Sequence, residues 1–501
     1  MTRPLRLAEF IAAISLATDL GMGQPLEQCL RTCLTALELA EAAGVERDTL
    51  PEVYYTALLR FLGCTADAHE TADLAGGDDI ALRAAIAPVL GAPPREFLGA
   101  VLPSLAAGRG APARVAAAAG FLAHGAARLR EGVRAHCEAA EMLAVRLGLP
   151  DGTRAALGAA FEMWDGHGFP NGLSGEAIPP AARIVILARH VEVIARLQGP
   201  DAVRTALRGR AGHSLDPALA ALAVRNLDGL LDAARAEMPW DEALRREPSP
   251  RAEVPAERLE EVLAVFGDFS DLKEPARAGF SRDVAALAAF AVPDSAETVR
   301  QTALVQDIGR VAVPSGGRTS PANDERLRLH PYYSERILAR TPATAPLARL
   351  AGMHHERLDG SGYYRGASAS ELPWAARVLA AADAFRELLV PAAGHTRTVA
   401  QAADALAREA PGKLDPDAVD AVLAAAGLHG RRARTAAPAG LTDREVEVLR
   451  HLCHGATKKE IASALIISPS TADHHVRHIY AKVGVSSRAA ATLFAVEHDL
   501  L

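Results

Sequence analysis

The chain has 501 residues, of which half are apolar and only 4% are aromatic, and its formal net charge is −7 at pH 7. This length exceeds what one hydrophobic core supports, so several domains are expected. The negative charge argues against a surface covered by nucleic acid, although it leaves room for one small DNA-binding domain. Five scattered cysteines without a CxxC pair argue against a zinc knuckle and a disulfide scaffold. Composition therefore predicts an all-α protein.

Two features bear on location. No run of 18 or more uninterrupted apolar residues occurs, and the N-terminus MTRPLRLAEFIAAIS lacks the cleavage pattern of a signal peptide. We therefore expect no membrane partner and a cytoplasmic protein.

The first 430 residues contain two related segments. His136 is followed 29 residues later by Asp165, and His330 is followed 29 residues later by Asp359. An arginine comes 18 residues after each aspartate, in IPPAAR and in LPWAAR. The similarity continues through ILARH and LAAAD to LDPALAAL and LDPDAVDAVL. So many equal spacings indicate the duplication of one helical domain.

Linker composition sets the expected domain boundaries. REPSPRAEVP is rich in proline and charge, and LHGRRARTAAPAG is small, basic and unpatterned. The predicted parts are a first helical domain at 1–245, a second at 246–430, a basic linker at 431–440 and a C-terminal domain at 441–501.

The second segment carries a candidate metal site in MHHERLDGSGYYRG. His354 and His355 lie on adjacent faces of a helix, and DGSG then turns the chain so that the imidazoles and Asp359 lie near one point. Imidazole with carboxylate suits zinc, manganese or iron.

Residues 256 to 425 resemble the HD-GYP domain, a metal-dependent phosphohydrolase family whose members typically hydrolyse cyclic di-GMP. The matching motifs are QDIGR, HPYYSERIL, HHERLDGSGYY and AARVLAAAD. The resemblance implies a metal centre that holds Mn, Fe or Zn. Its implied ligands are Asp307, His330, His354, His355 and Asp383.

Two family histidines are replaced in this sequence. Gln306 stands in place of the histidine of the His-Asp pair, and Phe280 stands in place of the histidine of an earlier Gly-His-Ser. A metal-activated hydroxide needs a correctly held and charged cluster. We therefore expect a partial site and a chain that has lost phosphohydrolase activity.

The first segment has lost still more of the pattern. Arg60 and Phe61 occupy the His-Asp position, Phe161 follows an alanine at the paired histidines, and Arg189 replaces the closing aspartate. Only His136 remains. We predict a folded HD-like domain without a metal.

The C-terminal 61 residues predict four short helices. Thr442 with Glu445 and Thr457 with Glu460 have capping-box spacing, and Ser468 precedes a proline at the first position of a third helix. This arrangement describes a helix-turn-helix module. LTDREVEVL, KKEIASAL and ISPSTADHHVRHIYAKVGVSSRAAA resemble the DNA-binding domain of the LuxR family over its full length.

The third helix divides into a buried and an outward face. Ala472, Val476, Ile479 and Val483 form the expected buried stripe. The outward side chains would enter the major groove, and lysines would reach phosphate. The candidate DNA contacts are Lys458, Lys459, Ser470, Thr471, His474, Arg477 and Lys482. The LuxR resemblance implies a dimer formed by the last helix, with Leu493 and Val496 as candidates.

Two functions remain open from the sequence. The first is a transcriptional regulator with promoter DNA as its partner, in which the tandem HD-like domains form a sensory or dimerising body that binds a small molecule or nucleotide. The second is an active phosphohydrolase for cyclic di-GMP or another phosphoester, coupled to DNA binding. The metal ligands favour the second, whereas Phe280 and Gln306 oppose it.

Overall fold

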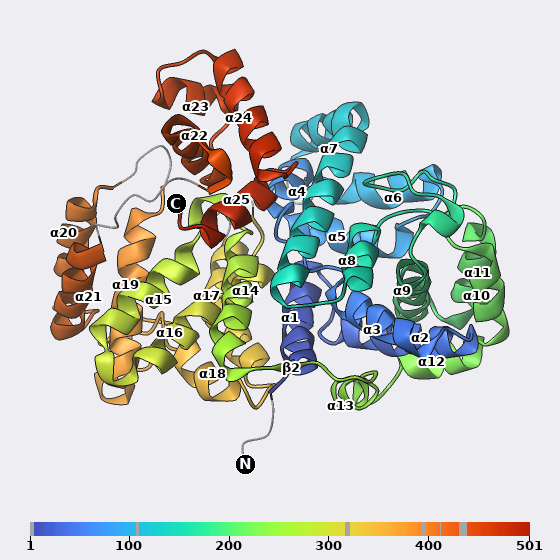
Figure 1. Cartoon of the computed structure of the whole chain (residues 1–501), viewed down its shortest axis with the longest axis horizontal. Coiled ribbons are helices and arrows are strands. Elements are labelled where there is room, and N and C mark those ends of the chain that lie inside the picture. Colours follow the sequence, from blue (N-terminus) through green and yellow to red (C-terminus); the bar gives the residue numbers. More distant parts are fainter. Residues whose placement is uncertain (1–4, 107–109, 316–320, 392–396, 411, 430–437) are drawn as a thin grey trace. The chain divides into compact units, whose positions relative to one another are not determined.

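The computed structural model describes residues 5–106, 110–315, 321–391, 397–410, 412–429 and 438–501. Most of the predicted linker at 431–440 therefore lies outside the described residues. The described chain is helical almost throughout (Figure 1), which confirms the predicted all-α class. Its one sheet pairs the two-residue strands β1 (Leu5–Arg6) and β2 (Glu253–Val254) antiparallel. Within the described ranges, no helix is both long and apolar enough to cross a membrane.

The chain forms two compact units, which divide between Arg258 and Leu259. Pro314 and Ser315 belong with the first unit, where the Ser315 amide donates to Asp79 Oδ1 at 2.8 Å. The first unit thus ends a few residues beyond the predicted boundary at 245.

The first unit is built from helices around an apolar core that begins with α1 and α2, both almost wholly buried. Its helices are α1 (Leu7–Gly21), α2 (Gln28–Ala42), η1 (Arg47–Thr49), α3 (Leu50–Leu59), α4 (Ala68–Ala75), α5 (Asp79–Ile86), η2 (Ala87–Val89), α6 (Pro94–Ser104), α7 (Ala111–Arg146), α8 (Asp151–Gly158), η3 (Gly175–Ala177), α9 (Pro180–Gln198), α10 (Pro200–Arg210), α11 (Pro217–Arg225), α12 (Leu227–Ala234), α13 (Pro239–Arg245) and η4 (Ala256–Arg258).

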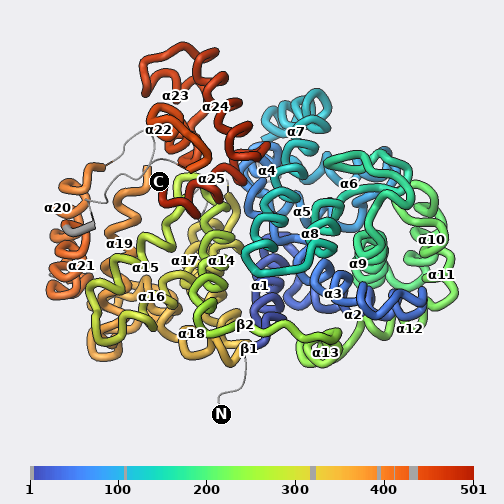
Figure 2. The backbone as a smooth tube through the Cα atoms, in the orientation of Figure 1, coloured from blue at the N-terminus to red at the C-terminus, as the bar shows by residue number. Residues whose placement is uncertain are grey.

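The second unit contains the second HD-like segment and the C-terminal helices, and Figure 2 follows its backbone from α14 to α25. Its helices are α14 (Leu259–Asp271), η5 (Pro275–Arg277), α15 (Phe280–Ala291), η6 (Pro293–Ser295), α16 (Ala296–Val305), η7 (Ile308–Ala312), α17 (Pro321–Leu338), α18 (Ala345–Ala351), η8 (Ala369–Glu371), α19 (Trp374–Leu389), α20 (Val399–Glu409), α21 (Pro416–His429), η9 (Pro438–Gly440), α22 (Asp443–Cys453), α23 (Lys458–Ala464), α24 (Pro469–Val483) and α25 (Arg488–Glu497).

The sequence repeat is matched by repeated contacts. In the first unit Arg183 of α9 pairs with Asp216 at 2.8 Å, and in the second unit Arg377 of α19 pairs with Asp415 at 2.9 Å. Each aspartate also accepts backbone N–H bonds at the start of the next helix, α11 or α21. An equivalent arginine therefore links equivalent helices in the two units.

A glycine in each unit brings two chain segments unusually close. A Cβ on Gly63 would lie 1.9 Å from the carbonyl oxygen of His136, and a Cβ on Gly309 would lie 2.1 Å from that of His330. No side chain fits in either place, so only glycine permits the approach. In each unit, the glycine lets the segment that follows α3 or α16 contact the helix that carries the histidine.

Candidate metal centre and nucleic-acid interface

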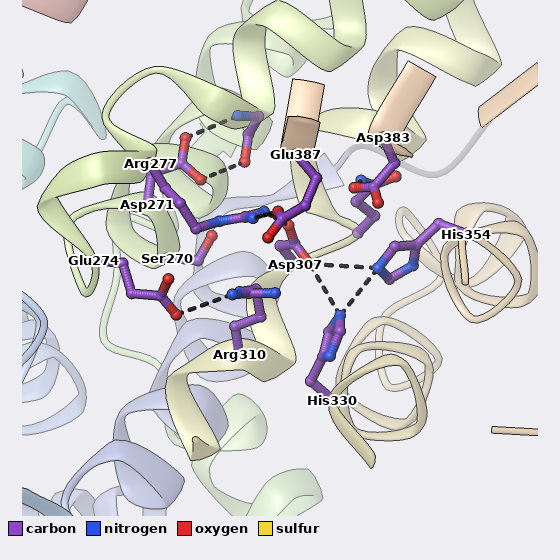
Figure 3. Close-up of polar contacts among 12 residues, drawn as sticks. Ser270, Asp271, Glu274, Arg277, Asp307, Arg310, His330, His354, Asp383 and Glu387 are labelled. Atoms are coloured by element: carbon purple, nitrogen blue, oxygen red, sulfur yellow. Dashed lines mark hydrogen bonds and ion pairs between the residues drawn. The ribbon is translucent and has the colours of Figure 1, made fainter. Parts of the chain in front are cut away.

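The five predicted metal ligands come from four separate parts of the second unit. Asp307 lies between α16 and η7, His330 is in α17, His354 and His355 directly follow α18, and Asp383 is in α19. Four of them, all except Asp383, have ligand atoms within 4.8 Å of one another. Figure 3 shows His330 and His354 pointing at Asp307 from neighbouring segments.

Three atoms form a tight triangle at the centre of this cluster. His330 Nε2 lies 3.0 Å from His354 Nε2 and 3.1 Å from Asp307 Oδ1, and His354 Nε2 lies 3.4 Å from the same oxygen. Ligands about 2.1 Å from one ion are separated by about 3.0 Å in octahedral and about 3.4 Å in tetrahedral geometry. The triangle therefore fits one face of the coordination shell of a single metal ion.

The ring tautomers follow from backbone contacts. Nδ1 of His330 lies 2.6 Å from the carbonyl oxygen of Leu327, and Nδ1 of His354 lies 2.6 Å from that of Ala351. A carbonyl only accepts, so both Nδ1 atoms must donate, as metal-binding histidines usually do. The two Nε2 lone pairs and a carboxylate oxygen then face one another, which requires a cation between them.

In the absence of a metal, a proton is the available cation. Burial lowers the pKa of His330 to about 4. Burial also lowers that of His354, but the neighbouring Asp307 outweighs burial and leaves the pKa of His354 raised. Asp307 therefore favours protonation of His354 over protonation of His330.

Arg277 occupies the other side of Asp307. Its guanidinium pairs with Asp307 Oδ2 and with Glu387, and it lies 3.4 Å from the centroid of the Phe280 ring. Burial raises the pKa of Asp307, but the Arg277 charge and both imidazoles hold it well below its usual range. A permanent protein cation thus holds the Asp307 oxygen that a second metal ion would need.

Gln306, which stands in place of the other family histidine, occupies an oxygen of Asp383. Gln306 Nε2 donates to Asp383 Oδ1 at 2.8 Å, and His355 Nδ1 lies 3.7 Å from Asp383 Oδ2. Burial raises the pKa of Asp383 to about 6. The donor set fits one ion at Asp307, His330 and His354, and it does not fit a second ion beside Arg277 and Gln306.

Phe61 and Phe161 occupy the corresponding place in the first unit, with ring centroids 6.4 Å apart. Nε2 of His136 lies 3.1 Å from the Arg60 carbonyl, so this nitrogen donates. Nδ1 of His136 lies 4.0 Å from Asp67 Oδ1. The metal-free first domain stays a prediction.

The C-terminal helices have the local structure that the sequence predicts. Thr442 and Thr457 form complete capping boxes at α22 and α23, and Ser468 accepts the Thr471 amide at the start of α24. In α24, Ala472, Val476 and Ile479 are buried as predicted; the fourth member of the expected stripe, at 483, is half-buried.

The outward face of α24 is open to solvent. Ser470, Thr471, His474 and Arg477 are all exposed. On α23, Lys458 and Lys459 are exposed too. These six candidate DNA contacts therefore remain accessible in the described chain.

Two acidic residues compete with DNA for the predicted cations. Asp473 pairs with both Lys458 and Arg477. Lys482 donates to Glu445 Oε2 at 2.7 Å and to the Gly440 carbonyl at 2.9 Å. A phosphate contact by Lys482 would have to break an ion pair that holds α24 to α22.

The candidate dimerisation residues of α25 are buried. Leu493 is 2% exposed and Val496 is 7% exposed. A dimer that uses these side chains must first uncover them.

Arg277 is the site residue that sequence reasoning missed. It lies three residues before Phe280, in RAGFS, and no family motif marks it. The only available signal was indirect, because a buried Asp307 deprived of metal ligands needs another cation. Which of the chain's arginines supplies it depends on the tertiary structure.

The comparisons with known proteins agree with this organisation. Residues 69–219 and 262–418 match the HD domain family, and this chain belongs to it. Residues 439–495 match the family of bacterial regulatory proteins called the luxR family, so the chain also carries a LuxR-type helix-turn-helix DNA-binding domain. The predicted tandem HD-like segments and the LuxR-type domain are confirmed.

Individual relatives match either most of the chain or only a short part of it. A 3'3'-cGAMP-specific phosphodiesterase 3 of Vibrio cholerae is 27% identical over 410 residues, which cover 76% of this chain and 86% of that protein. The probable transcriptional regulatory protein NarL of Mycobacterium tuberculosis is 43% identical over 77 residues, 15% of this chain and 36% of that protein. The crystal structure of a V. cholerae cyclic GMP-AMP phosphodiesterase has the same fold, with a TM-score of 0.57 and 22% identity over 85% of this chain and 99% of that one.

Proposed function

We propose that this protein is a cytoplasmic transcription regulator in which the tandem HD domains receive a signal and the LuxR-type domain binds promoter DNA. The observation that carries the proposal is the Arg277 guanidinium on Asp307, beside Phe280. It removes the second metal position, while the exposed face of α24 keeps what DNA reading requires. Tandem HD domains with an impaired catalytic centre, joined to a DNA-binding domain, suit regulation better than catalysis.

The signal acts through a difference in affinity. An effector of small-molecule or nucleotide type changes DNA binding only as far as it binds two arrangements of the protein unequally. A homodimer would convert such a change into altered spacing of two DNA-binding domains.

The test is selection of DNA fragments from a genomic library by the full chain. We expect a short set of enriched promoter fragments, and Arg477→Ala and His474→Ala should each weaken binding to them. Arg208→Ala is the matched control, because Arg208 is an exposed arginine of α10 in the first unit. Absence of enrichment, or enrichment that survives both α24 variants, would contradict the proposal.

The second candidate function is phosphoester hydrolysis, and the Asp307–His330–His354 triangle favours it. These three residues would hold one Mn, Fe or Zn ion, which would supply an activated water. The relative named as a 3'3'-cGAMP-specific phosphodiesterase, and the resemblance to the HD-GYP family whose members typically hydrolyse cyclic di-GMP, make those two dinucleotides the substrates to test.

Metal content separates the two functions. We expect at most one ion per chain in protein loaded separately with Mn, Fe or Zn, and no hydrolysis of either dinucleotide. Reverting Phe280→His and Gln306→His should not add a second ion while Arg277 remains, whereas adding Arg277→Ala to the double variant should. Two ions in the unaltered chain, together with hydrolysis, would establish the enzyme instead.

A further inference from the structure

Two arginines of the first unit are buried with hydrogen-bond donors that no protein atom accepts. Arg60 is 2% exposed and Arg189 is 3% exposed. In both side chains, Nε and Nη1 are buried without a hydrogen-bond partner. Arg189 Nη2 donates to the Ala87 carbonyl at 2.8 Å. Buried donors of this kind are costly unless something accepts from them.

Their charges are uncompensated as well. The groups that act on Arg60 are Arg189 and the thiols of Cys137 and Cys29, and burial together with this surrounding lowers the pKa of Arg60 to about 9. Burial likewise lowers the pKa of Arg189 to about 10. A guanidinium stays protonated at neutral pH even so, and two positive charges therefore share this interior.

The nearest carboxylate to act on Arg189 is already engaged. Glu192 Oε1 accepts from Arg196 Nε at 2.8 Å, and its Oε2 accepts from Gln28 at 3.1 Å. Glu192 thus balances part of the positive charge of Arg189, but its oxygens accept hydrogen bonds from other residues.

Aromatic rings position both guanidiniums. The Cζ atoms of Arg60 and Arg189 lie 5.6 and 5.8 Å from the centroid of the Phe61 ring, and Arg60 Cζ lies 5.1 Å from that of Phe161. A ring interacts with the cation as a whole and accepts no in-plane N–H. The rings therefore contact both cations and leave their N–H donors available.

The location matches that of the metal cluster in the second unit. Arg60 and Arg189 take the repeat positions of Gln306 and Asp383, around the histidine that both repeats keep. In the second unit Arg277 is neutralised by two carboxylates. In the first unit the charge relation is inverted, because cations stand where the other repeat has an anion.

We propose that Arg60 and Arg189 form an oxyanion site in the first unit and that its ligand is a phosphate group, either free or as part of a phosphoester. Guanidinium N–H groups match the oxygens of phosphate in spacing and direction. Two fixed positive charges balance a doubly charged anion. The site lies outside the Asp307 cluster, and the inference does not depend on the proposed regulatory function.

The experiment measures phosphate on the full chain in two ways. In the first, protein purified in phosphate-free buffer is unfolded, and the released inorganic phosphate and total phosphorus are assayed. In the second, thermal unfolding of the folded protein is measured at increasing concentrations of inorganic phosphate. Sodium chloride of equal ionic strength is the reference. We expect either about one retained phosphorus per chain or a rise in the midpoint with phosphate alone. Phosphorus without inorganic phosphate identifies a phosphoester, whereas inorganic phosphate identifies the free ion.

Variants assign the effect to the pair. Arg60→Met and Arg189→Met keep much of the side-chain volume and remove the charge, and each should weaken phosphate binding at least tenfold. Arg208→Met, which changes an exposed arginine of the same unit, should bind phosphate normally. Arg60→Lys and Arg189→Lys keep the charge, so they serve if a methionine variant fails to fold, and they should still bind phosphate severalfold more weakly.

Two results would overturn the proposal. If the unaltered chain retains no phosphorus and shows no phosphate-specific shift, while Arg60→Met unfolds at a higher temperature, then the pair is an uncompensated charge covered only by water. Phosphate binding that both methionine variants keep would place the ion elsewhere and overturn it equally.

Discussion

The two HD domains of this chain differ in the charges that lie at the equivalent site. The second unit keeps Asp307, His330 and His354 in a triangle of metal-like dimensions and adds Arg277 on the free oxygen of Asp307. In the first unit, two buried arginines lie against phenylalanine rings instead. The comparison teaches that the charges buried at one position of a duplicated domain need not have the same sign or the same partners in its two copies.

Removing Arg277 should have the largest effect on stability. In chelator, Arg277→Ala leaves Asp307 buried without its ion pair, and we expect the second unit to lose about 3 to 5 kcal/mol. Urea unfolding measures this loss, and Mn²⁺ should restore part of it only in the variant. Arg300→Ala, which breaks the exposed pair with Glu260 at 3.6 Å, is the control. A loss below about 1 kcal/mol would show that the guanidinium is not the compensating cation.

Acid should destabilise the first unit through His136. Burial lowers the pKa of His136 from 6.5 to about 3, so the unfolded chain takes up a proton below pH 6.5 that the folded chain refuses. Stability therefore falls as the pH drops from 6.5 towards 3, by about 1.4 kcal/mol per pH unit, or about 2 kcal/mol at pH 5. Urea unfolding at pH 6.5 and pH 5 should show a smaller difference in His136→Gln.

The matched control for this pH effect is His69→Gln, because His69 is exposed. It should keep the full acid sensitivity. Equal acid sensitivity in His136→Gln and in the unaltered chain would contradict the assignment.

The repeated arginine allows one substitution to be compared in both units. Arg377 donates to Asp415 and also to the carbonyls of Leu372 and Ala369, whereas Arg183 donates to Asp216 and its Nε is buried without a partner. We expect Arg377→Ala to cost about 2 kcal/mol and Arg183→Ala about 1 kcal/mol in urea unfolding. Equal losses would mean that the two extra carbonyl bonds add nothing.

The smallest expected effect is at the DNA-binding face. Asp473→Asn should release Lys458 and Arg477 and remove one negative charge, which raises DNA affinity about fivefold to tenfold. Titration of a labelled promoter fragment at several salt concentrations measures the gain, which should shrink as salt increases. Asp499→Asn changes an exposed aspartate of the same domain beyond α25 and serves as the control. Unchanged affinity in Asp473→Asn would show that those cations do not reach phosphate.

Much of the fold was predictable because its signals are local. Thr442 with Glu445, Thr457 with Glu460 and Ser468 before Pro469 all form the caps that their spacing indicates. The duplication was predictable for a related reason, since equal spacings record equal structures. The boundary near residue 258 was less predictable, because proline-rich composition marks a linker only approximately.

The candidate site was predictable in its ligands and not in its charge balance. The motifs identified Asp307, His330 and His354 as candidate ligands, and the structure places their ligand atoms together. Nothing local to the sequence linked Arg277 to Asp307, or Arg60 to Arg189, because each pair is far apart along the chain. Likewise, the ion pair between Lys482 and Glu445 followed from the packing of α24 on α22 rather than from either helix alone.

The sequence by itself therefore determined the helices, the duplication, the DNA-binding module and the identity of the metal-type side chains, since these follow from local spacing and motif. Tertiary structure alone decided which charge faces which: Arg277 against Asp307, Gln306 against Asp383, and the buried Arg60 and Arg189 without a carboxylate between them. The physical reason is that electrostatic compensation depends on distance in space and on burial, and neither quantity is written in the separation of residues along the chain.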